Sequence, residues 1–122
     1  MSARIIVIDD DERIRLLYQT ELSAAGFAVK TAASGSQAIG MVAAERFDLA
    51  LLDIEMPDMG GLEVLGMIRE IAPNMRVILN SAYAVHKADF KSWLADAYLV
   101  KSSDTKLLKQ KIKELVAPRE HS

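Results

Sequence analysis

Polar side chains that can do chemistry directly follow several apolar runs of this sequence. Asp9 and Asp10 come after "RIIVI", and Asp53 closes the run "LALLD". Ser81 follows "VILN" and Lys101 follows "AYLV". Three carboxylates cannot share a small volume unless one of them takes up a proton or a cation neutralises them. If the fold brings these residues together, their types indicate a cation site with an ammonium and a hydroxyl group beside it.

Carboxylate oxygens suit a hard cation, and Mg²⁺ is commonly bound by one or two carboxylates together with phosphate oxygens and water. A metal ion held by the acids after the first run would leave Asp53 facing an open coordination position. Lys101 would add a point charge and Ser81 a hydroxyl donor. Together these groups predict a phosphoryl-transfer site in which the carboxylate of Asp53 is the nucleophile.

The elements that must position these residues alternate between strand-like and helix-like segments. Apolar runs predict strands over residues 4–8, 27–32, 49–53, 76–80 and 97–100. Helical spacing predicts helices over residues 14–25 and 60–73, and another that begins at Ser36 as its cap. A brief helical stretch is expected over residues 89–95, where Phe90, Trp93 and Leu94 share a face. The last predicted helix is capped by Ser103 or Asp104, and one face of it is lined by Leu108, Ile112, Leu115 and Val116.

This alternation predicts an α/β fold, with a five-stranded parallel doubly wound sheet and helices on both faces. The expected strand order is 2-1-3-4-5, which makes the first and third strands neighbours. Ligands of such sheets bind beyond the carboxyl ends of the strands. Asp9, Asp10 and Asp53 should therefore converge. We expect one domain over residues 1–122 and no output domain.

Composition excludes several classes of protein. The chain has 122 residues, 51% of them apolar, a formal net charge of −2 and no cysteine. Disulfides, thiolate catalysis and cysteine-bound zinc are thereby excluded. The charge gives no reason to expect nucleic acid or an anionic membrane as a partner. No apolar run approaches the roughly 20 residues that span a bilayer, and no signal peptide is apparent, so we expect a cytoplasmic protein.

Four motifs in order resemble those of the response-regulator receiver domain, the phosphorylated half of two-component signalling. They cover essentially the whole chain: "IIVIDDDE", "LLDIEMPDMGGLEVL", "VILNSAYA" and "AYLVK". The resemblance implies that Asp53 accepts phosphate from a histidine kinase, a phosphotransfer protein or a small phosphodonor. It also implies a Mg²⁺ ion that Asp53 and Asp10 bind directly, Asp9 through water, and Glu55 with its backbone carbonyl.

The same resemblance implies a switch. Lys101 pairs with the phosphoryl group, Ser81 moves to bond it, and Tyr98 changes rotamer in response. The protein would then be a switch and not a turnover enzyme, binding a downstream effector protein as a monomer or a weak phosphorylation-dependent dimer. Two features depart from the family. Ser102 stands where Pro usually follows the lysine, which leaves the bond between them cis or trans, and the segment between Ser81 and Lys101 is about two residues shorter than usual.

Other interpretations remain open at this stage. The acids at positions 9–11 could simply cap the first helix. A phosphatase could use Asp9 and Asp11 as its acidic pair. Phosphatases of that family carry a cap insertion, which this sequence lacks, and have Thr or Val at the position of Glu12. A flavodoxin-like binder of FMN would need a Ser/Thr/Gly-rich loop after the first strand. A degenerate receiver that serves only as a docking module is the main alternative to the switch.

Overall fold

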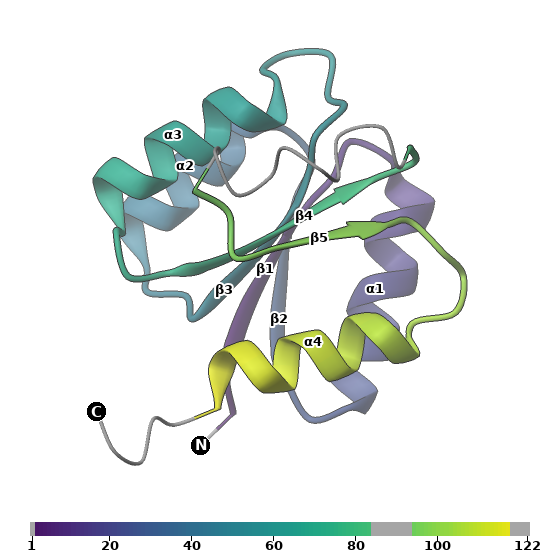
Figure 1. Cartoon of the computed structure of the whole chain (residues 1–122). Coiled ribbons are helices and arrows are strands. Elements are labelled where there is room, and N and C mark those ends of the chain that lie inside the picture. Colours follow the sequence, from purple (N-terminus) through teal and green to yellow (C-terminus); the bar gives the residue numbers. More distant parts are fainter. Residues whose placement is uncertain (1, 84–93, 118–122) are drawn as a thin grey trace.

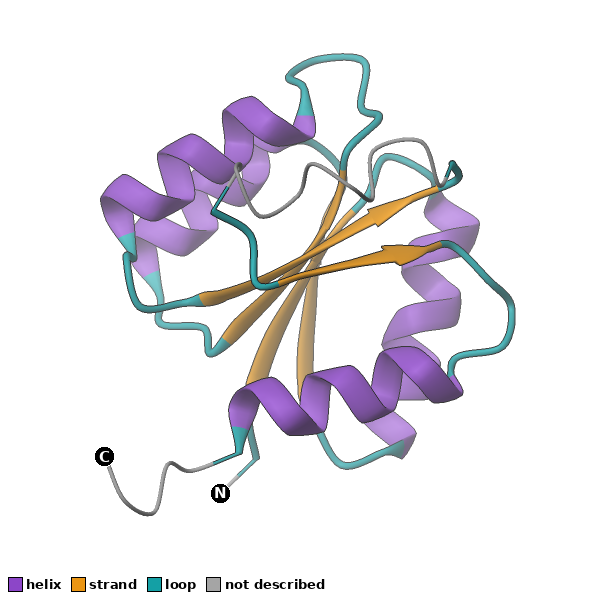
Figure 2. Cartoon of the chain, in the orientation of Figure 1, coloured by secondary structure: helices purple, strands orange, loops and turns teal. Residues whose placement is uncertain are grey.

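The structure, a computed structural model, describes residues 2–83 and 94–117 and contains one parallel sheet with helices on both faces (Figures 1 and 2). Its strands are β1 (Arg4–Ile8), β2 (Ala28–Ala32), β3 (Leu49–Asp53), β4 (Arg76–Ser81) and β5 (Ala97–Val100). The helices in these residues are α1 (Glu12–Ala24), α2 (Gly35–Ala44), α3 (Gly61–Ile71) and α4 (Lys106–Val116). The strand order is β2-β1-β3-β4-β5, as the sequence predicts.

The central position of β3 follows from its composition. All five of its residues are buried, because helices cover both faces of the strand and it has no solvent-facing side. Strand β2 lies at one edge and alternates between exposed and less exposed residues, which fits its mixed sequence. The register pairs Ile8 of β1 with Leu52 of β3, so these two strands end side by side.

Two separate cores hold the helices to the sheet. Helices α2 and α3 cover one face and helices α1 and α4 cover the other (Figure 1). The first core contains Ile6, Ile8, Ala38, Val42, Ala50, Leu52, Val64, Leu65 and Ile68. The second contains Ile5, Val7, Tyr18, Leu22, Leu49, Leu51, Leu108 and Ile112. Successive strand residues thus point to opposite cores, and the apolar runs are continuous because both faces are covered.

The caps of the first two helices differ from the sequence interpretation in part. Asp11, not its two acidic neighbours, caps α1, and its Oδ1 accepts a hydrogen bond of 2.9 Å from the backbone N–H of Arg13. The prediction that Ser36 caps α2 is wrong, because Ser34 takes that position. Ser34 Oγ accepts from the Gln37 N–H at 3.1 Å. The Gln37 side chain accepts in turn from the N–H that precedes the cap, so the two side chains satisfy donors on both sides of the helix start.

The start of α4 also differs from the prediction. The helix begins at Lys106 and Thr105 is its cap residue, so neither Ser103 nor Asp104 holds that place. Asp104 Oδ1 still accepts from the Lys106 N–H at 3.0 Å. The Thr105 hydroxyl donates instead to Glu21 Oε1 of α1, at 2.9 Å. A contact with a helix distant in sequence therefore takes the side chain that would otherwise cap α4.

The brief helical stretch predicted over residues 89–95 lies largely outside the described residues, including Phe90 and Trp93. Leu94, which was expected to share their apolar face, is 68% exposed and has a backbone φ of 65°. This backbone conformation is not helical, so the predicted helix does not extend to Leu94. In residues 2–83 and 94–117, no helix is long and apolar enough to cross a membrane.

Candidate functional site

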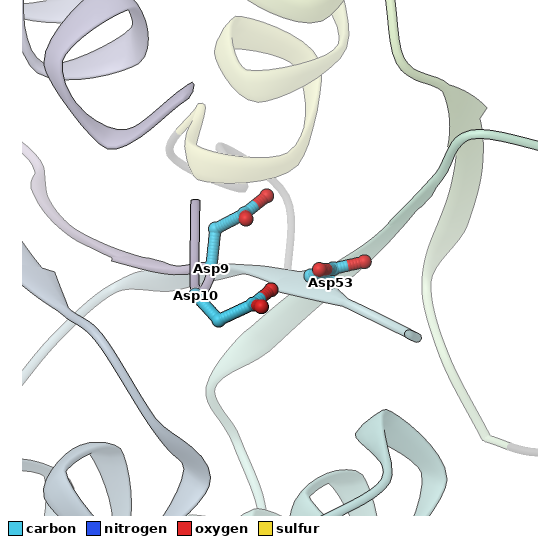
Figure 3. Close-up of side chains that lie close together, drawn as sticks. All are labelled: Asp9, Asp10 and Asp53. Atoms are coloured by element: carbon cyan, nitrogen blue, oxygen red, sulfur yellow. The ribbon is translucent and has the colours of Figure 1, made fainter. Parts of the chain in front are cut away.

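Three carboxylates meet at the carboxyl end of the sheet. Figure 3 shows Asp9 and Asp10 at the end of β1 and Asp53 at the end of β3, with their side chains close together. Each residue offers one oxygen, and these oxygens all lie within 4.8 Å of one another. Asp9 and Asp53 are each 2% exposed, whereas Asp10 is exposed. The structure thus brings together the three acids that the sequence analysis singled out, two of them almost without access to solvent.

Lys101 supplies the positive charge that faces two of these acids. Its backbone N–H donates to the carbonyl of Ser81 at 2.7 Å, which fixes the residue at the end of β5 beside β4. Its ammonium Nζ lies 2.9 Å from Asp9 Oδ2 and 3.3 Å from Asp53 Oδ2. One ammonium therefore bridges the acids of two neighbouring strands.

The other oxygen of each buried carboxylate is held by the backbone. Asp9 Oδ1 accepts from the Asp11 N–H at 2.9 Å, and Asp53 Oδ1 accepts from the Glu55 N–H at 3.0 Å. Arg15 adds a support that the sequence analysis did not identify, since its Nη1 donates to the Asp9 carbonyl at 2.7 Å. These bonds leave Oδ2 of both acids pointing to Lys101 and fix the direction of each carboxylate.

The charges at the site are not balanced. Burial, followed by the neighbouring charge of Asp9, raises the pKa of Asp53 to about 7, although Lys101 and the Glu55 N–H oppose the rise. Burial alone would lower the pKa of Lys101, but hydrogen bonding and charge from Asp9, and then from Asp53, raise it above its ordinary value. The cluster thus holds three carboxyl groups, and the ammonium of Lys101 pairs with two of them. This excess of negative charge and the oxygen-only donor set fit a hard divalent cation such as Mg²⁺.

A hydrogen-bonded chain runs beside the carboxylates. Ser81 is fully buried, and its Oγ donates to Glu55 Oε1 at 2.5 Å and accepts from the Tyr83 N–H at 3.0 Å. The hydroxyl of the buried Tyr98 donates to the Tyr83 carbonyl at 2.5 Å. The sequence analysis assigned the backbone carbonyl of Glu55 to the site and predicted no partner for its side chain. It missed the side-chain contact and the linking role of Tyr83.

Gly61 shapes the loop that follows Asp53. Its N–H donates to the Ile54 carbonyl at 3.0 Å, so the start of α3 packs directly on this loop. A Cβ atom at position 61 would lie 2.5 Å from the Asp53 carbonyl oxygen and 2.5 Å from the Ile54 Cα. Real Cβ atoms do not approach backbone this closely, so the loop geometry requires glycine here. The bond between Lys101 and Ser102 is trans, which answers the question that the missing proline raised.

The sequence that forms this site also matches a known protein family. A model of the response regulator receiver domain matches residues 5–113 of the chain. The chain belongs to this family. Receiver domains are the signalling modules of two-component response regulators, and the fold with strand order 2-1-3-4-5 is the one that solved receivers share with this chain.

Two relatives show how far the sequence likeness extends. The receiver is 40% identical over 83 residues to sporulation initiation phosphotransferase F of Bacillus subtilis, which covers 68% of this chain and 67% of that protein. It is 37% identical over 82 residues to response regulator MprA of Mycobacterium tuberculosis, covering 67% of this chain and 36% of that protein. The aligned part of the receiver thus spans about a third of the length of MprA.

Solved structures extend the likeness to the whole fold. Response regulator protein TrrA of Thermotoga maritima, in complex with Mg²⁺-BeF, matches with a TM-score of 0.87 and 42% identity, over 93% of this receiver and 98% of that chain. A structure of histidine kinase ThkA in complex with TrrA matches with a TM-score of 0.86 and 42% identity, over 94% of this receiver and 99% of that chain.

Proposed function

We propose that this receiver accepts a phosphoryl group on Asp53 and that phosphorylation changes its binding to a downstream protein. One observation carries the proposal: the Asp53 carboxylate is buried, points to the Lys101 ammonium at 3.3 Å, and shares a small volume with two other carboxylates. A buried acid with a raised pKa beside a fixed cation at a strand end is typical of a reacting group, and less so of a structural ion pair.

The reaction is a transfer between a donor nitrogen and a carboxylate oxygen. An oxygen of ionised Asp53 attacks phosphorus, the bond from phosphorus to the histidine nitrogen of the donor breaks, and its electron pair stays on that nitrogen. Lys101 stands where its ammonium can pair with the phosphoryl oxygens. Its contact with Asp9 keeps the ammonium at the site before the phosphoryl group arrives.

Asp9, Asp10 and Asp53 would hold Mg²⁺, together with the backbone carbonyl of Glu55. When bound, the ion supplies positive charge that favours ionised Asp53 and neutralises phosphoryl oxygens. Asp9 and Asp53 are already oriented by their backbone hydrogen bonds. Asp10 is exposed and can turn toward the ion without breaking a buried contact. The complex of the relative TrrA with Mg²⁺-BeF supports this assignment.

The readout would pass through Ser81 and Tyr98. Ser81 lies one residue beyond Asn80, which pairs with Asp53 in the register of β4 with β3, so its hydroxyl belongs to the same end of the sheet. Tyr98 is connected to Ser81 through the backbone of Tyr83. We propose a histidine kinase or a phosphotransfer protein as phosphodonor, supported by the complex of ThkA with TrrA. The receiver then acts as a binding switch and not as a turnover enzyme.

The test is the intact mass of the chain after incubation with acetyl phosphate and Mg²⁺. The wild-type chain is expected to gain one phosphoryl group. Asp53→Asn should gain none, and EDTA should prevent the gain in the wild type. Asp58→Asn is the matched control, because Asp58 is an exposed acid of the same loop and its loss should leave the gain intact. Equal labelling of Asp53→Asn and wild type would contradict Asp53 as the acceptor.

A further inference from the structure

The hydroxyl of Ser81 both donates and accepts a hydrogen bond in this structure. It donates its proton to Glu55 Oε1 at 2.5 Å and accepts from the Tyr83 N–H at 3.0 Å. Ser81 has no exposed surface, so water does not compete for either bond. A hydroxyl carries one proton and can donate to one acceptor at a time. Any other group that needs this proton must displace the Glu55 carboxylate.

Glu55 is placed to make this contact by the residue that we assign as the phosphoryl acceptor. It lies two residues after Asp53, and its N–H donates to Asp53 Oδ1 at 3.0 Å. Its side chain is exposed, so the Ser81 hydroxyl is a contact that the carboxylate keeps at a cost in side-chain freedom. The bond is charge-assisted, which makes it stronger than a bond between neutral groups.

We propose that Glu55 is a positioning residue that holds the Ser81 hydroxyl in the unphosphorylated receiver, so that the Glu55 carboxylate and a phosphoryl group on Asp53 compete for the same proton. The inference rests on the proposed function of Asp53. It adds that the resting state is held by a specific bond, and that this bond is broken each time the receiver switches.

The competition extends to Tyr98 through two hydrogen bonds of the loop after β4. The Tyr83 N–H donates to Ser81 Oγ, and the Tyr83 carbonyl accepts from the Tyr98 hydroxyl. When Ser81 turns from Glu55 to a phosphoryl group, its oxygen moves relative to the Tyr83 N–H. The Tyr83 peptide groups then follow, and with them the carbonyl that Tyr98 binds. Glu55 therefore influences the position of Tyr98 through a series of hydrogen bonds that passes through Ser81 and Tyr83.

A double-mutant cycle tests the proposal, with beryllium fluoride and Mg²⁺ as the probe and the dissociation constant as the readout. The four proteins are wild type, Glu55→Ala, Ser81→Ala and the double variant. Glu55→Ala should tighten binding on the order of tenfold, because the probe no longer competes with a carboxylate for the hydroxyl. In the Ser81→Ala background, the same change should have an effect of less than about threefold, since no hydroxyl remains to be released.

Simple charge repulsion predicts a different result. If the Glu55 carboxylate only repels the anionic probe, its removal tightens binding equally with and without Ser81, and that additive result would overturn the proposal. Glu55→Gln separates the effects further, because it removes the charge but keeps an acceptor for Ser81, and its effect should fall between wild type and Glu55→Ala. Asp58→Asn, which removes a charge from the same loop, is expected to change the dissociation constant by less than about twofold.

The unliganded receiver gives an independent readout. Glu55→Ala should shift the amide resonance of Tyr83 in an NMR spectrum, since the N–H donates to an oxygen whose proton is no longer held, whereas Asp58→Asn should not. An unchanged resonance overturns the proposal even if Ser81→Ala does not fold. Failure of the proposed function looks different: the wild type would neither bind beryllium fluoride nor gain a phosphoryl group, and both proposals would fall together.

Discussion

The ammonium of Lys101 and the carboxylate of Asp9 form the closer of the two ion pairs at the end of the sheet, at 2.9 Å. The pair with Asp53 is longer, at 3.3 Å. Lys101 therefore pairs with a proposed metal ligand, Asp9, as well as with the proposed phosphoryl acceptor, Asp53. In the chain without a metal ion, it is the cation that keeps two buried carboxylates in one volume.

Loss of Lys101 should accordingly destabilise the fold. Lys101→Met leaves Asp9 and Asp53 buried without their cation, and we expect the free energy of unfolding at pH 7 in EDTA to fall by about 2–4 kcal/mol. Urea unfolding measures this. Lys111→Met is the matched control, because Lys111 pairs with the exposed Glu114 and its loss should cost less than about 0.5 kcal/mol. Equal losses for the two variants would show that the buried ion pairs of Lys101 contribute no more to the free energy of unfolding than the exposed pair of Lys111.

The raised pKa of Asp53 should make stability depend on pH. Its pKa moves from an ordinary value of 3.8 to about 7 in the folded chain. Between these values, the folded chain holds a proton that the unfolded chain has released. The stabilisation is therefore complete below pH 3.8 and is lost as the pH rises to about 7.

Urea unfolding of wild type and Asp53→Asn at several pH values in EDTA measures this difference. The wild type should lose stability relative to Asp53→Asn as the pH rises from about 4 to about 7, and the difference should then stay constant. Because Mg²⁺ favours the ionised acid, its addition should reduce the decline. Parallel stability curves for the two proteins would argue against a raised pKa at this residue.

Two glycines of α3 should respond in opposite ways to the same substitution. Gly61→Ala places a Cβ 2.5 Å from the Asp53 carbonyl oxygen, and should destabilise the chain by about 1–3 kcal/mol and lower its rate of phosphorylation. Gly66→Ala meets no atom within 4 Å and should stabilise the helix by about 0.5–1 kcal/mol. Thermal unfolding of both variants measures the contrast. A neutral Gly61→Ala would mean that the loop after Asp53 shifts freely.

Asp10 should affect the metal ion without affecting the fold. It is exposed, so Asp10→Asn is expected to change the free energy of unfolding in EDTA by less than about 0.5 kcal/mol. The dissociation constant for Mg²⁺ should rise about tenfold or more, because one charged ligand is lost. Isothermal titration calorimetry measures it, with Glu12→Gln as a control that removes a nearby exposed acid. Unchanged Mg²⁺ affinity in Asp10→Asn would remove Asp10 from the ligand set.

Much of this arrangement could be predicted because it depends on patterns that are local in sequence. Continuous apolar runs predicted β1 and β3 as strands covered on both faces, and both are buried. Once the strand order was inferred, the polar residue after each run had to lie at one end of the sheet. Ser34 could have been identified as well, because a serine followed three residues later by a glutamine, here Gln37, is a sequence signature of a helix start.

The features that the sequence did not predict depend on side chains that are distant in sequence. Thr105 could have capped α4, but its hydroxyl binds Glu21, 84 residues away. The contact of Glu55 with Ser81 spans 26 residues and depends on the rotamer of an exposed side chain. No periodicity or spacing encodes such choices, because they are decided only when the strands and helices have packed.

The spatial order of the strands in the sheet has a consequence for the folding of the protein. Asp9, Asp53 and Lys101 come from the beginning, the middle and the last part of the chain, and they meet only when β1, β3, β4 and β5 have paired. Parallel pairings between distant segments are slow steps in folding. A growing or partly unfolded chain lacks the lysine beside the acids, so the proposed acceptance of phosphate would require that all four of these strands have paired. The proposed reaction would therefore be confined to the folded protein.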